Sequence, residues 1–486
     1  MEIFVLAFYI SICAVLLIYS IVEFTLLLNF LFRKQKHSQK NWDELPYVTI
    51  QLPMFNEAFV VERLLDQIVK MDYPKAKLEI QVLDDSNDET VDKAKVKVEF
   101  YRKQGIDIQY ITREKREGFK AGALDFGLKT AKGEFVAIFD ADFLPTEDFL
   151  LKALPYFVNE KVGVVQSRWT YVNEHFSLLT RLQTIMLNTH FYVEHAGRNR
   201  SGAYINFNGT AGIWRKECIS DAGGWLADTL TEDLDLSFRA QTRGWEFVYA
   251  MEIESPSELP ITFPGYKTQQ FRWAKGAAEC AKKNIPGLWK SKKSSFWAKL
   301  IGSFHLLNSS VFLIVLSFII LSFPLTNSLH HLPKASWIFN IITAFMVSNV
   351  LLLAVFFGGN IGQGKNKLVS GLLFPFTFIS FLIVNMGVSL YMSLGVIEGY
   401  LGKKSDFVRT PKFNVIGKTK STFGKYARVK ITPLLVMEAL FVVYGIFQIN
   451  YAYGIGDVFA VVFASMFAIG FGYNVGSTVY YSTRKS

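Results

Sequence analysis

The sequence predicts an α/β domain with a mostly parallel sheet, inserted between transmembrane α-helices. Half of the 486 residues are hydrophobic and only 19% are charged, which is more apolar than an average soluble protein. The long uncharged runs lie at the two ends of the chain. Between residues 33 and 295, short β-branched runs alternate instead with amphipathic stretches, the pattern of a parallel sheet covered by helices. We therefore expect an integral membrane protein with one water-soluble domain.

Residues 1–32 are predicted to form an N-terminal transmembrane helix. The run from Phe4 to Val22 carries no charge and is long enough for a bilayer core, which takes about 20 helical residues. The basic stretch "FRKQKHSQK" follows it. Because positive charge stays on the cytoplasmic side, the N-terminus is expected outside and the soluble domain in the cytosol. The three cysteines have unrelated spacings and indicate no disulfide framework.

Residues 33–295 are predicted to form the cytosolic domain, ending in interfacial helices. Five strands are expected, at "YVTIQLP", "LEIQVLDDS", "IDIQYITR", "EFVAIFDAD" and "VGVVQSRW", with helices on both faces of the sheet. Polar clusters follow three of them: "PMFNE", "DDSND" and "DADFLP". Each cluster alone is typical of a turn. Together they predict a ligand crevice beyond the carboxyl ends of the strands.

A basic loop lies between these acidic loops. Lys115, Arg116 and Lys120 flank Gly118 at the start of a predicted helix, a combination that favours phosphate binding, although a solvated basic loop has the same composition. Asp140 and Asp142 offer oxygen ligands to a divalent cation. Basic and acidic loops together predict a nucleotide diphosphate bound with Mg²⁺ or Mn²⁺.

Residues 296–486 are predicted to form a membrane channel region. The segment 368–399 is interrupted by Pro375 and two glycines and is expected to be interfacial or re-entrant. If it crossed, the basic segment 403–430, with nine Lys or Arg and one Asp, would lie outside, against the usual bias. We therefore expect five crossings, and six plain spans are the alternative. The other expected spans are 303–323, 336–357, 431–453 and 458–480.

Several motifs in the soluble domain resemble a known family. "FDAD", "TED" and "QQFRW" follow one another in the order and at the separations of processive family 2 glycosyltransferases of the cellulose synthase superfamily. "GFKAGAL", "FNGTAGIWR" and "AGGW" are most similar to the cellulose-synthase-like enzymes that make β-mannan and β-glucan backbones. The resemblance implies a GT-A-like glycosyltransferase domain.

The resemblance also implies roles for individual residues. Asp233 of "TED" would be the general base that deprotonates the acceptor hydroxyl. The donor nucleotide would be bound by Glu57, Asp84, Asp85, Lys120 and Asp140, and the metal by Asp140 and Asp142. The donor pyrophosphate and the acceptor sugar would be bound by Gln269, Gln270, Arg272, Trp273 and Asn208.

The segment "FVRTPK" resembles the gating loop that closes over the nucleotide in cellulose synthases, with Phe407, Thr410 and Lys412 at the matching positions. Two departures from the pattern concern the site. Arg409 stands where the family usually has Val, and Phe143 follows "DAD" where bacterial cellulose synthases have His.

The chemistry of glycosyl transfer explains why the site needs acids in two places. Displacement at the anomeric carbon needs a base on the acceptor side and charge neutralisation on the leaving diphosphate. Thr229 or Thr231 is expected to cap a helix that begins near Glu232, and the helix N-terminus should keep Asp233 ionised at neutral pH. Without the other motifs, these acids would only favour the helix dipole, and Trp273 would only anchor a membrane interface.

The resemblance implies a membrane-embedded, inverting, processive β-glycosyltransferase in the plasma (inner) membrane. It would polymerise hexose from UDP-glucose or GDP-mannose into a β-1,4-linked glucan or (gluco)mannan and translocate the product, with membrane lipids around it. Two alternatives are a lipid glycosyltransferase that adds one sugar and a non-catalytic exporter or scaffold. No nucleic-acid partner is expected despite a pI of 9.2, because the cations cluster near the membrane segments. Polar residues that could line a polymer tunnel or simply pack the bundle are Trp297, His305, Asn308, Ser309 and Ser310.

Overall fold

A computed structural model describes residues 2–35, 39–331, 336–361, 367–405, 407–417 and 432–483. Residues 406 and 418–430 of the predicted basic segment lie outside the described residues. The strands are β1 (Val48–Met54), β2 (Leu78–Asp84), β3 (Ile108–Ile111), β4 (Phe135–Ile138), β5 (Val162–Tyr171), β6 (Gly212–Arg215) and β7 (Glu246–Ser257). The helices of the α/β domain are α2 (Val61–Ile68), α3 (Thr90–Lys103), α4 (Phe119–Leu128), α5 (Phe149–Ala153), α6 (Leu178–Asn188), α7 (Ala196–Ser201), α8 (Lys216–Asp221), α9 (Glu232–Arg243) and α10 (Phe263–Lys290), with short helical turns at Lys75–Lys77, Leu154–Val158 and Thr189–His195.

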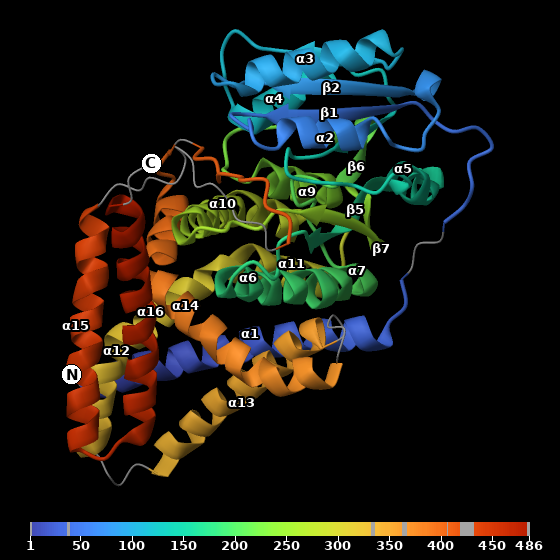
Figure 1. Cartoon of the computed structure of the whole chain (residues 1–486). Coiled ribbons are helices and arrows are strands. Elements are labelled where there is room, and N and C mark those ends of the chain that lie inside the picture. The colour runs from blue at the N-terminus through green and yellow to red at the C-terminus, as the bar shows by residue number, and fades with distance from the viewer. Residues whose placement is uncertain are drawn as a thin grey trace.

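One seven-stranded mixed sheet forms the centre of the α/β domain, in the order β3-β2-β1-β4-β6-β5-β7 (Figure 1). The five predicted strands are confirmed as β1 to β5. β6 and β7 were not predicted. β6 is the one strand that runs against its neighbours, since it pairs antiparallel with β4 and β5, while β7 pairs parallel with β5. The carboxyl ends of the other strands therefore lie along one edge, where ligands bind in such sheets.

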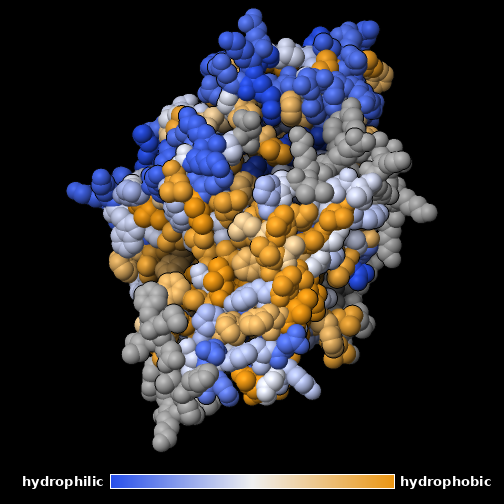
Figure 2. Space-filling model, turned by 90° about the vertical axis from the view of Figure 1, so that its left-hand side faces the viewer, coloured by the Kyte–Doolittle hydropathy of each residue, from blue (hydrophilic) through white to orange (hydrophobic). Residues whose placement is uncertain are grey.

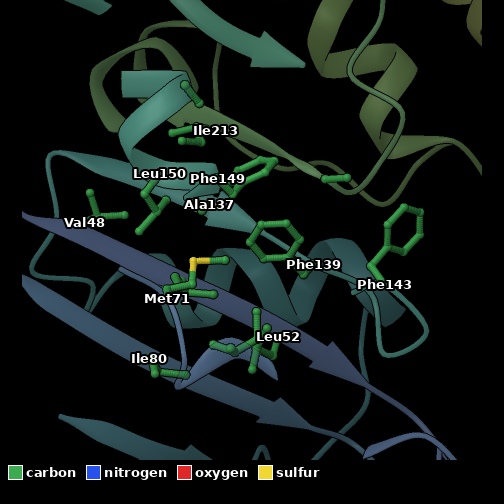
Figure 3. Packing of buried hydrophobic residues seen from close by; sticks show 14 of the residues in the cluster. Val48, Leu52, Met71, Ile80, Ala137, Phe139, Phe143, Phe149, Leu150 and Ile213 are labelled. Atoms are coloured by element: carbon green, nitrogen blue, oxygen red, sulfur yellow. The ribbon is translucent and has the colours of Figure 1, made fainter. Parts of the chain in front are cut away.

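Two apolar clusters cover the two faces of the sheet. On one face, α2, α3 and α5 pack against alternate residues of β1 and β2, such as Leu52 and Ile80 (Figure 3). On the other face, α4, α8 and α9 pack around Trp214 of β6. The side chains of a strand point alternately to the two faces. Both faces are thus buried, as the sequence predicted for a sheet with helices on both sides.

Helix α10 joins the α/β domain to the apolar helices (Figure 1). It is 28 residues long and carries "QQFRW" in its first half. Two lysines on α10, the buried Lys275 and the partly exposed Lys267, form ion pairs with acids of the C-terminal helices: Lys267 with Glu438 at 2.5 Å and Lys275 with Glu398 at 3.1 Å. Buried charges need such partners because leaving one unpaired is costly. These pairs fix α10 against the C-terminal helices.

The apolar helices lie at both ends of the chain. They are α1 (Glu2–Phe32), α11 (Phe296–Leu307), α12 (Val311–His331), α13 (Ser336–Asn360), α14 (Lys367–Leu401), α15 (Pro433–Gly454) and α16 (Val458–Thr483), with a short turn at Asn308–Ser310 between α11 and α12. Within the described residues, five stretches are long and apolar enough to cross a membrane: Val5–Phe32, Phe296–Ser328, Gly371–Leu401, Pro433–Gly454 and Val458–Thr483. Figure 2 shows a broad apolar surface on this part of the molecule, below the hydrophilic surface of the α/β domain. These long apolar helices identify the chain as an integral membrane protein.

The predicted interruptions in segment 368–399 are not found, because α14 is one helix over all 35 residues. A re-entrant path, which needs a reversal of the chain, does not fit this continuous helix. Its glycines serve close packing instead. A Cβ on Gly387 would lie 2.2 Å from the carbonyl oxygen of Gly470 in α16, and one on Gly399 would lie 2.5 Å from the carbonyl oxygen of Lys275 in α10. Small residues allow helix backbones to approach in this way.

Candidate active site

A cavity opens at the carboxyl edge of the sheet and collects most of the predicted site residues. Its wall comes from the loops after β1, β2 and β4, the start of α9, the first half of α10 and residues 407–417, which we call the strap. The predicted residues that line it are Glu57, Asp85, Lys120, Asp140, Asp142, Asn208, Asp233, Gln269, Arg272, Trp273, Phe407, Thr410 and Lys412. The structure therefore brings together segments that are more than 350 residues apart in the sequence.

Asp84 and Gln270 are the two predicted site residues that do not line the cavity. The carboxylate of Asp84 accepts hydrogen bonds from the hydroxyl of Tyr110, at 2.8 Å, and from the amide of Ser86, at 2.9 Å. It therefore holds the end of β2 in place. Asp85 points the other way and is held by Arg113, whose Nε donates to it at 3.0 Å. Gln270 is buried on a different face of α10 from the cavity.

The two aspartates of "DAD" have different partners. Lys120, at the start of α4, donates to Asp140 at 2.5 Å and to the carbonyl oxygen of Gly209 at 2.9 Å. Burial by itself lowers the pKa of Lys120, but the nearby carboxylates, Asp140 first, raise it above its usual value. Asp142 instead accepts from Lys412 of the strap at 2.7 Å. Each carboxylate therefore already faces one cation.

The donor set at this position fits a divalent cation held together with a phosphate. Asp140 and Asp142 line the same cavity, and in each case a lysine ammonium lies where positive charge is favoured. Among the residues that the structure describes, no three His, Cys, Asp or Glu side chains are grouped so that they could hold a metal ion. Mg²⁺ in such sites is commonly held by one or two carboxylates plus the substrate's phosphates. Phe143 is buried against Trp169 and belongs to the apolar core.

Asp233 lies in the first turn of α9, beside the loop that carries Asn208. A Cβ on Gly209 would lie 2.9 Å from Oδ2 of Asp233, and the φ of 79° at this position favours glycine. Burial, and then the charge of Glu232, raise the pKa of Asp233 to about 7. This differs from the expectation that the helix N-terminus keeps the group fully ionised at neutral pH. Burial and a like charge outweigh the dipole here.

The predicted cap of α9 is also different. Thr231 is the N-cap residue, but its side chain accepts no capping hydrogen bond and lies 3.4 Å from the sulfur of Cys280. Thr231 also packs against Gly276 of α10, where a Cβ would lie 2.6 Å from it. Asp235, the third acid of "TEDLD", is buried and paired with Arg239 and Asn284. α9 is therefore positioned by α10 and not by a hydroxyl cap.

Helix periodicity decides which residues of "QQFRW" face the cavity. Gln269, Arg272 and Trp273 are spaced i, i+3 and i+4, which places them on one face of a helix, and all three line the cavity. Burial lowers the pKa of Arg272, and the carboxylates of Glu232 and Asp140 partly oppose this. Arg272 also stacks on Phe407 of the strap, 4.4 Å from the ring centre.

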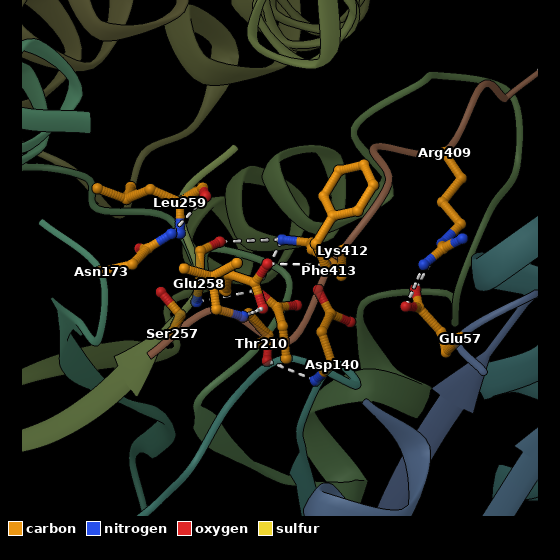
Figure 4. Close-up of polar contacts among 12 residues, drawn as sticks. Glu57, Asp140, Asn173, Thr210, Ser257, Glu258, Leu259, Arg409, Lys412 and Phe413 are labelled. Atoms are coloured by element: carbon orange, nitrogen blue, oxygen red, sulfur yellow. Dashed lines mark hydrogen bonds and ion pairs between the residues drawn. The ribbon is translucent and has the colours of Figure 1, made fainter. Parts of the chain in front are cut away.

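The strap lies across the cavity and is fixed by a buried acid that the sequence did not single out. Glu258, at the end of β7, accepts hydrogen bonds from the backbone amides of Phe413, at 2.8 Å, and Val415, at 3.2 Å. Arg409 forms a two-pronged ion pair with Glu57 (Figure 4). Burial raises the pKa of Glu57 to about 7, although Arg409 opposes the shift. No motif marks Glu258, whose role is visible only in three dimensions.

Three residues in or next to the loops of the cavity adopt left-handed backbone conformations without being glycine; of these, Phe119 lines the cavity itself. Asn56, Phe119 and Ala211 have φ values of 58°, 49° and 56°. Such conformations are uncommon for residues with a Cβ, rarest for bulky ones like Phe119, and persist only where the surrounding structure holds them. Their position at three cavity loops indicates that this wall is held in a fixed shape.

The residues proposed for a tunnel wall have partners within the helix bundle. Asn308 accepts from Tyr19 at 2.7 Å, and Ser310 lies 2.8 Å from the hydroxyl of Tyr400. His305 contacts Asn206 at 3.0 Å. Trp297 is 68% exposed beside Phe296. For Asn308, Ser310 and His305, these contacts are those expected of polar residues that pack a bundle.

Comparison with known proteins places this site in a family. The chain is 33% identical over 456 residues to glucomannan 4-beta-mannosyltransferase 1 of Oryza sativa subsp. japonica, covering 89% of this chain and 84% of that protein. It is 45% identical over 261 residues to glucomannan 4-beta-mannosyltransferase 2 of Arabidopsis thaliana, covering 52% of this chain and 49% of that protein. The region of higher identity thus spans about half of each chain.

A solved structure shares the fold. Mannosyltransferase PcManGT from Pyrobaculum calidifontis, in complex with GDP-Man and Mn²⁺, superposes with a TM-score of 0.53 at 19% identity and covers 82% of this chain and 100% of that one. At this identity the likeness supports the GT-A-like fold alone. The profile described as "Glycosyltransferase like family 2" matches residues 46–276, the segment that carries the "DAD", "TED" and "QQFRW" residues of the cavity. The chain is a glycosyltransferase and belongs to glycosyltransferase family 2.

Proposed function

We propose that the protein is an inverting, processive β-glycosyltransferase that transfers hexose from a nucleotide sugar to a growing β-1,4-linked polysaccharide at the cytosolic face of a plasma (inner) membrane. One observation carries the proposal: the carboxylates of Asp140, Asp142 and Asp233 line one cavity together with Arg272 and Trp273. Acids for a cation, an acid for proton transfer and an aromatic platform are the groups that direct displacement on a sugar requires.

In this proposal each group has one task. Lys120 and Arg272 hold the donor diphosphate, and Asp140 and Asp142 hold Mg²⁺ or Mn²⁺, which supplies charge neutralisation on the leaving diphosphate. Asp233 takes the proton of the acceptor hydroxyl as that oxygen attacks the anomeric carbon, whose bond to the diphosphate breaks. Trp273 supports the terminal acceptor sugar with its ring face. The relatives named as glucomannan mannosyltransferases support mannose as the hexose and GDP-mannose as the donor, with UDP-glucose as the second donor to test.

The strap has the contacts of a donor-binding element. Lys412 reaches Asp142, Thr410 lines the cavity, and Phe407 lies between Phe119 and Arg272. With donor and cation bound, Lys412 would exchange the carboxylate for a phosphate oxygen. Export of the product through the helix bundle is part of the proposal and rests on the position of the cavity beside α10 and the apolar helices.

The test uses the full chain purified in detergent. Labelled GDP-mannose and UDP-glucose are supplied separately with Mn²⁺ or Mg²⁺, and the products are digested with β-mannanase or β-1,4-glucanase. We expect a polymer that only one of these hydrolases degrades, and none from Asp233→Asn protein. A single glycolipid of fixed size would instead show transfer of one sugar to a lipid. No sugar transfer from either donor would contradict the proposed activity.

A further inference from the structure

The orientation of the cavity residue Asn208 is set by a chain of three side chains that ends on a membrane helix. Nδ2 of Asn206 lies 3.3 Å from the carbonyl oxygen of Phe207 and 2.8 Å from Oδ1 of Asn208. Oδ1 of Asn206 lies 3.0 Å from Nε2 of His305, in α11. We call Asn208, Asn206 and His305 the amide chain.

The direction of each hydrogen bond in the amide chain follows from its fixed end. A backbone carbonyl can only accept, so the Asn206 atom that faces Phe207 must be the nitrogen. The other atom of Asn206 is then oxygen, and it must accept from Nε2 of His305, which therefore carries a proton. The Asn208 atom that faces Asn206 must likewise be oxygen. Within the amide chain, His305 thus donates to Asn206 and Asn206 donates to Asn208, and the opposite direction is excluded.

The consequence lies at the cavity end. With its oxygen turned to Asn206, Asn208 leaves its NH₂ group without a partner among the residues that the structure describes. Asn208 lines the cavity. Its backbone amide is fixed as well, since it donates to Gln166 at 2.9 Å. A buried donor without a partner is costly, so such a group in a site is usually satisfied by a ligand or water.

The position of this NH₂ group indicates which kind of ligand atom it would bind. The next residue, Gly209, approaches Asp233 so closely that a Cβ there would lie 2.9 Å from the carboxylate. The carbonyl oxygen of Gly209 also accepts from Lys120 at 2.9 Å, so Asn208 lies where the donor and acceptor sugars meet in the proposed function. Hydroxyl oxygens of a hexose accept hydrogen bonds, whereas an amide oxygen in the same place would need a donor.

We propose that His305 is a positioning residue: through Asn206 it holds the NH₂ group of Asn208 toward a hydroxyl oxygen of the terminal acceptor hexose. The proposal rests on the proposed function for the identity of the ligand. Its distinctive content is that a residue of the membrane segment controls sugar binding without touching the sugar. His305 also stacks on Phe238 of α9, with ring centres 5.9 Å apart, so packing must be separated from orientation in the test.

The test is a double-mutant cycle on the full chain in detergent. His305→Leu removes the donor to Asn206, and His305→Gln keeps one. We expect His305→Leu to raise the KM for a β-1,4-oligosaccharide acceptor about tenfold with little change in the donor KM, and His305→Gln to stay within about threefold of the unmodified protein. In an Asn208→Ala background, His305→Leu should have no further effect, because the positioned group is gone.

Two further variants sharpen the result. Asn206→Asp keeps the shape but cannot donate, so Asn208 should turn its NH₂ group away from the cavity, and the acceptor KM should rise at least as much as in His305→Leu. Ser303→Ala is the matched control on α11, because Ser303 accepts a similar hydrogen bond from Trp289, at 3.0 Å, away from the amide chain. It should leave the acceptor KM unchanged.

A second readout does not require turnover. Oligosaccharide binding is measured as the rise in melting temperature of the purified protein, and the rise should shrink in Asn208→Ala and in His305→Leu. If the protein transfers no sugar but the rises in melting temperature follow the expected order, the proposed function is wrong, whereas the positioning role of His305 is supported. Equal effects of His305→Leu with and without Asn208, or no shift with any oligosaccharide in the unmodified protein, would overturn the amide chain.

Discussion

The fixed wall of the cavity and the strap are held by different kinds of contact. The wall loops belong to the sheet and its helices, and their shape is maintained by backbone pairing and by residues such as Phe119 in otherwise unfavourable conformations. The strap is held by Glu258 at its distal end, but over the cavity it relies on Lys412 with Asp142 and Arg409 with Glu57. The strap's partners are therefore acids that a cation and a donor need. Ligand binding would compete with the strap's contacts and, on the wall, with the pair between Lys120 and Asp140, but not with the backbone pairing of the wall.

The largest expected effect on sugar transfer comes from replacing the proposed proton acceptor of the wall, Asp233. Asp233→Asn should lower sugar transfer by about 10²–10⁴-fold, the range for a positioned general base, while nucleoside diphosphate binding stays within a few-fold. Transfer is measured as labelled hexose incorporated, and binding as the nucleotide-induced rise in melting temperature. Asp221→Asn, an exposed acid paired with Arg243, is the control and should behave like the unmodified protein. If Asp233→Asn protein still transferred sugar at the unmodified rate, Asp233 would not be the general base.

The second prediction concerns the pH dependence of the same group. Because burial and Glu232 raise the pKa of Asp233 to about 7, the base is protonated and inactive below that pH. kcat/KM should rise about tenfold per pH unit up to about pH 7 and then level off, so that activity at pH 5 is roughly a hundredth of the plateau. Initial rates from pH 5 to 9 at saturating cation check this. If kcat/KM did not change between pH 5 and 7, Asp233 would not be the group that accepts the proton.

Trp273 tests the part of the wall that α10 contributes. Removal of its ring in Trp273→Ala should weaken acceptor binding about tenfold, the size of one aromatic contact, and should reduce elongation more than donor hydrolysis. Polymer length and free hexose are measured in the same reaction. Trp297→Ala is the matched control, since Trp297 is exposed on α11. Polymer yield equal to that of the unmodified protein would show that Trp273 does not bind acceptor.

The smallest effect is expected in the strap. Arg409→Val installs the residue that the resembling gating loops carry and removes the pair with Glu57, while Glu258 still holds the distal end. The two changes, a freed Glu57 and a looser strap, oppose each other in donor binding, so the donor KM should shift by only about twofold to fivefold. Kinetics with varied donor measure it. A loss of activity as large as that of Asp233→Asn would show that the strap matters as much as the wall, which would contradict the difference drawn between them.

The sequence predicted the parts of the fold and site that follow from periodicity and short motifs. The five alternating strands are confirmed, and "DAD", "TED" and "QQFRW" meet at one cavity. β6 was missed because "GIWR" has only one β-branched residue and starts with a glycine, and β7 because its acids and Pro256 weaken the strand pattern. Both misses reflect pairing partners that are distant in the sequence.

Periodicity could also have corrected two of the site predictions. Adjacent residues at a strand end point to opposite sides, so only one of Asp84 and Asp85 can face the crevice. On a helix, Gln269, Arg272 and Trp273 share a face and Gln270 does not. The pKa of Asp233 and the role of Glu258 depend on burial by segments up to 155 residues away. No local pattern contains that information.

The two ion pairs under α10 determine how the protein can be divided. The partly exposed Lys267 and the buried Lys275 lie on the helix that carries Arg272 and Trp273, and their acids come from α15 and α14. A fragment that stops near residue 295 would keep both cations and lose both counter-charges, which would draw α10 toward solvent and turn its cavity face out of place. We therefore expect a fragment limited to the family 2 domain to be inactive, because α14 and α15 supply the counter-charges that hold α10 in place.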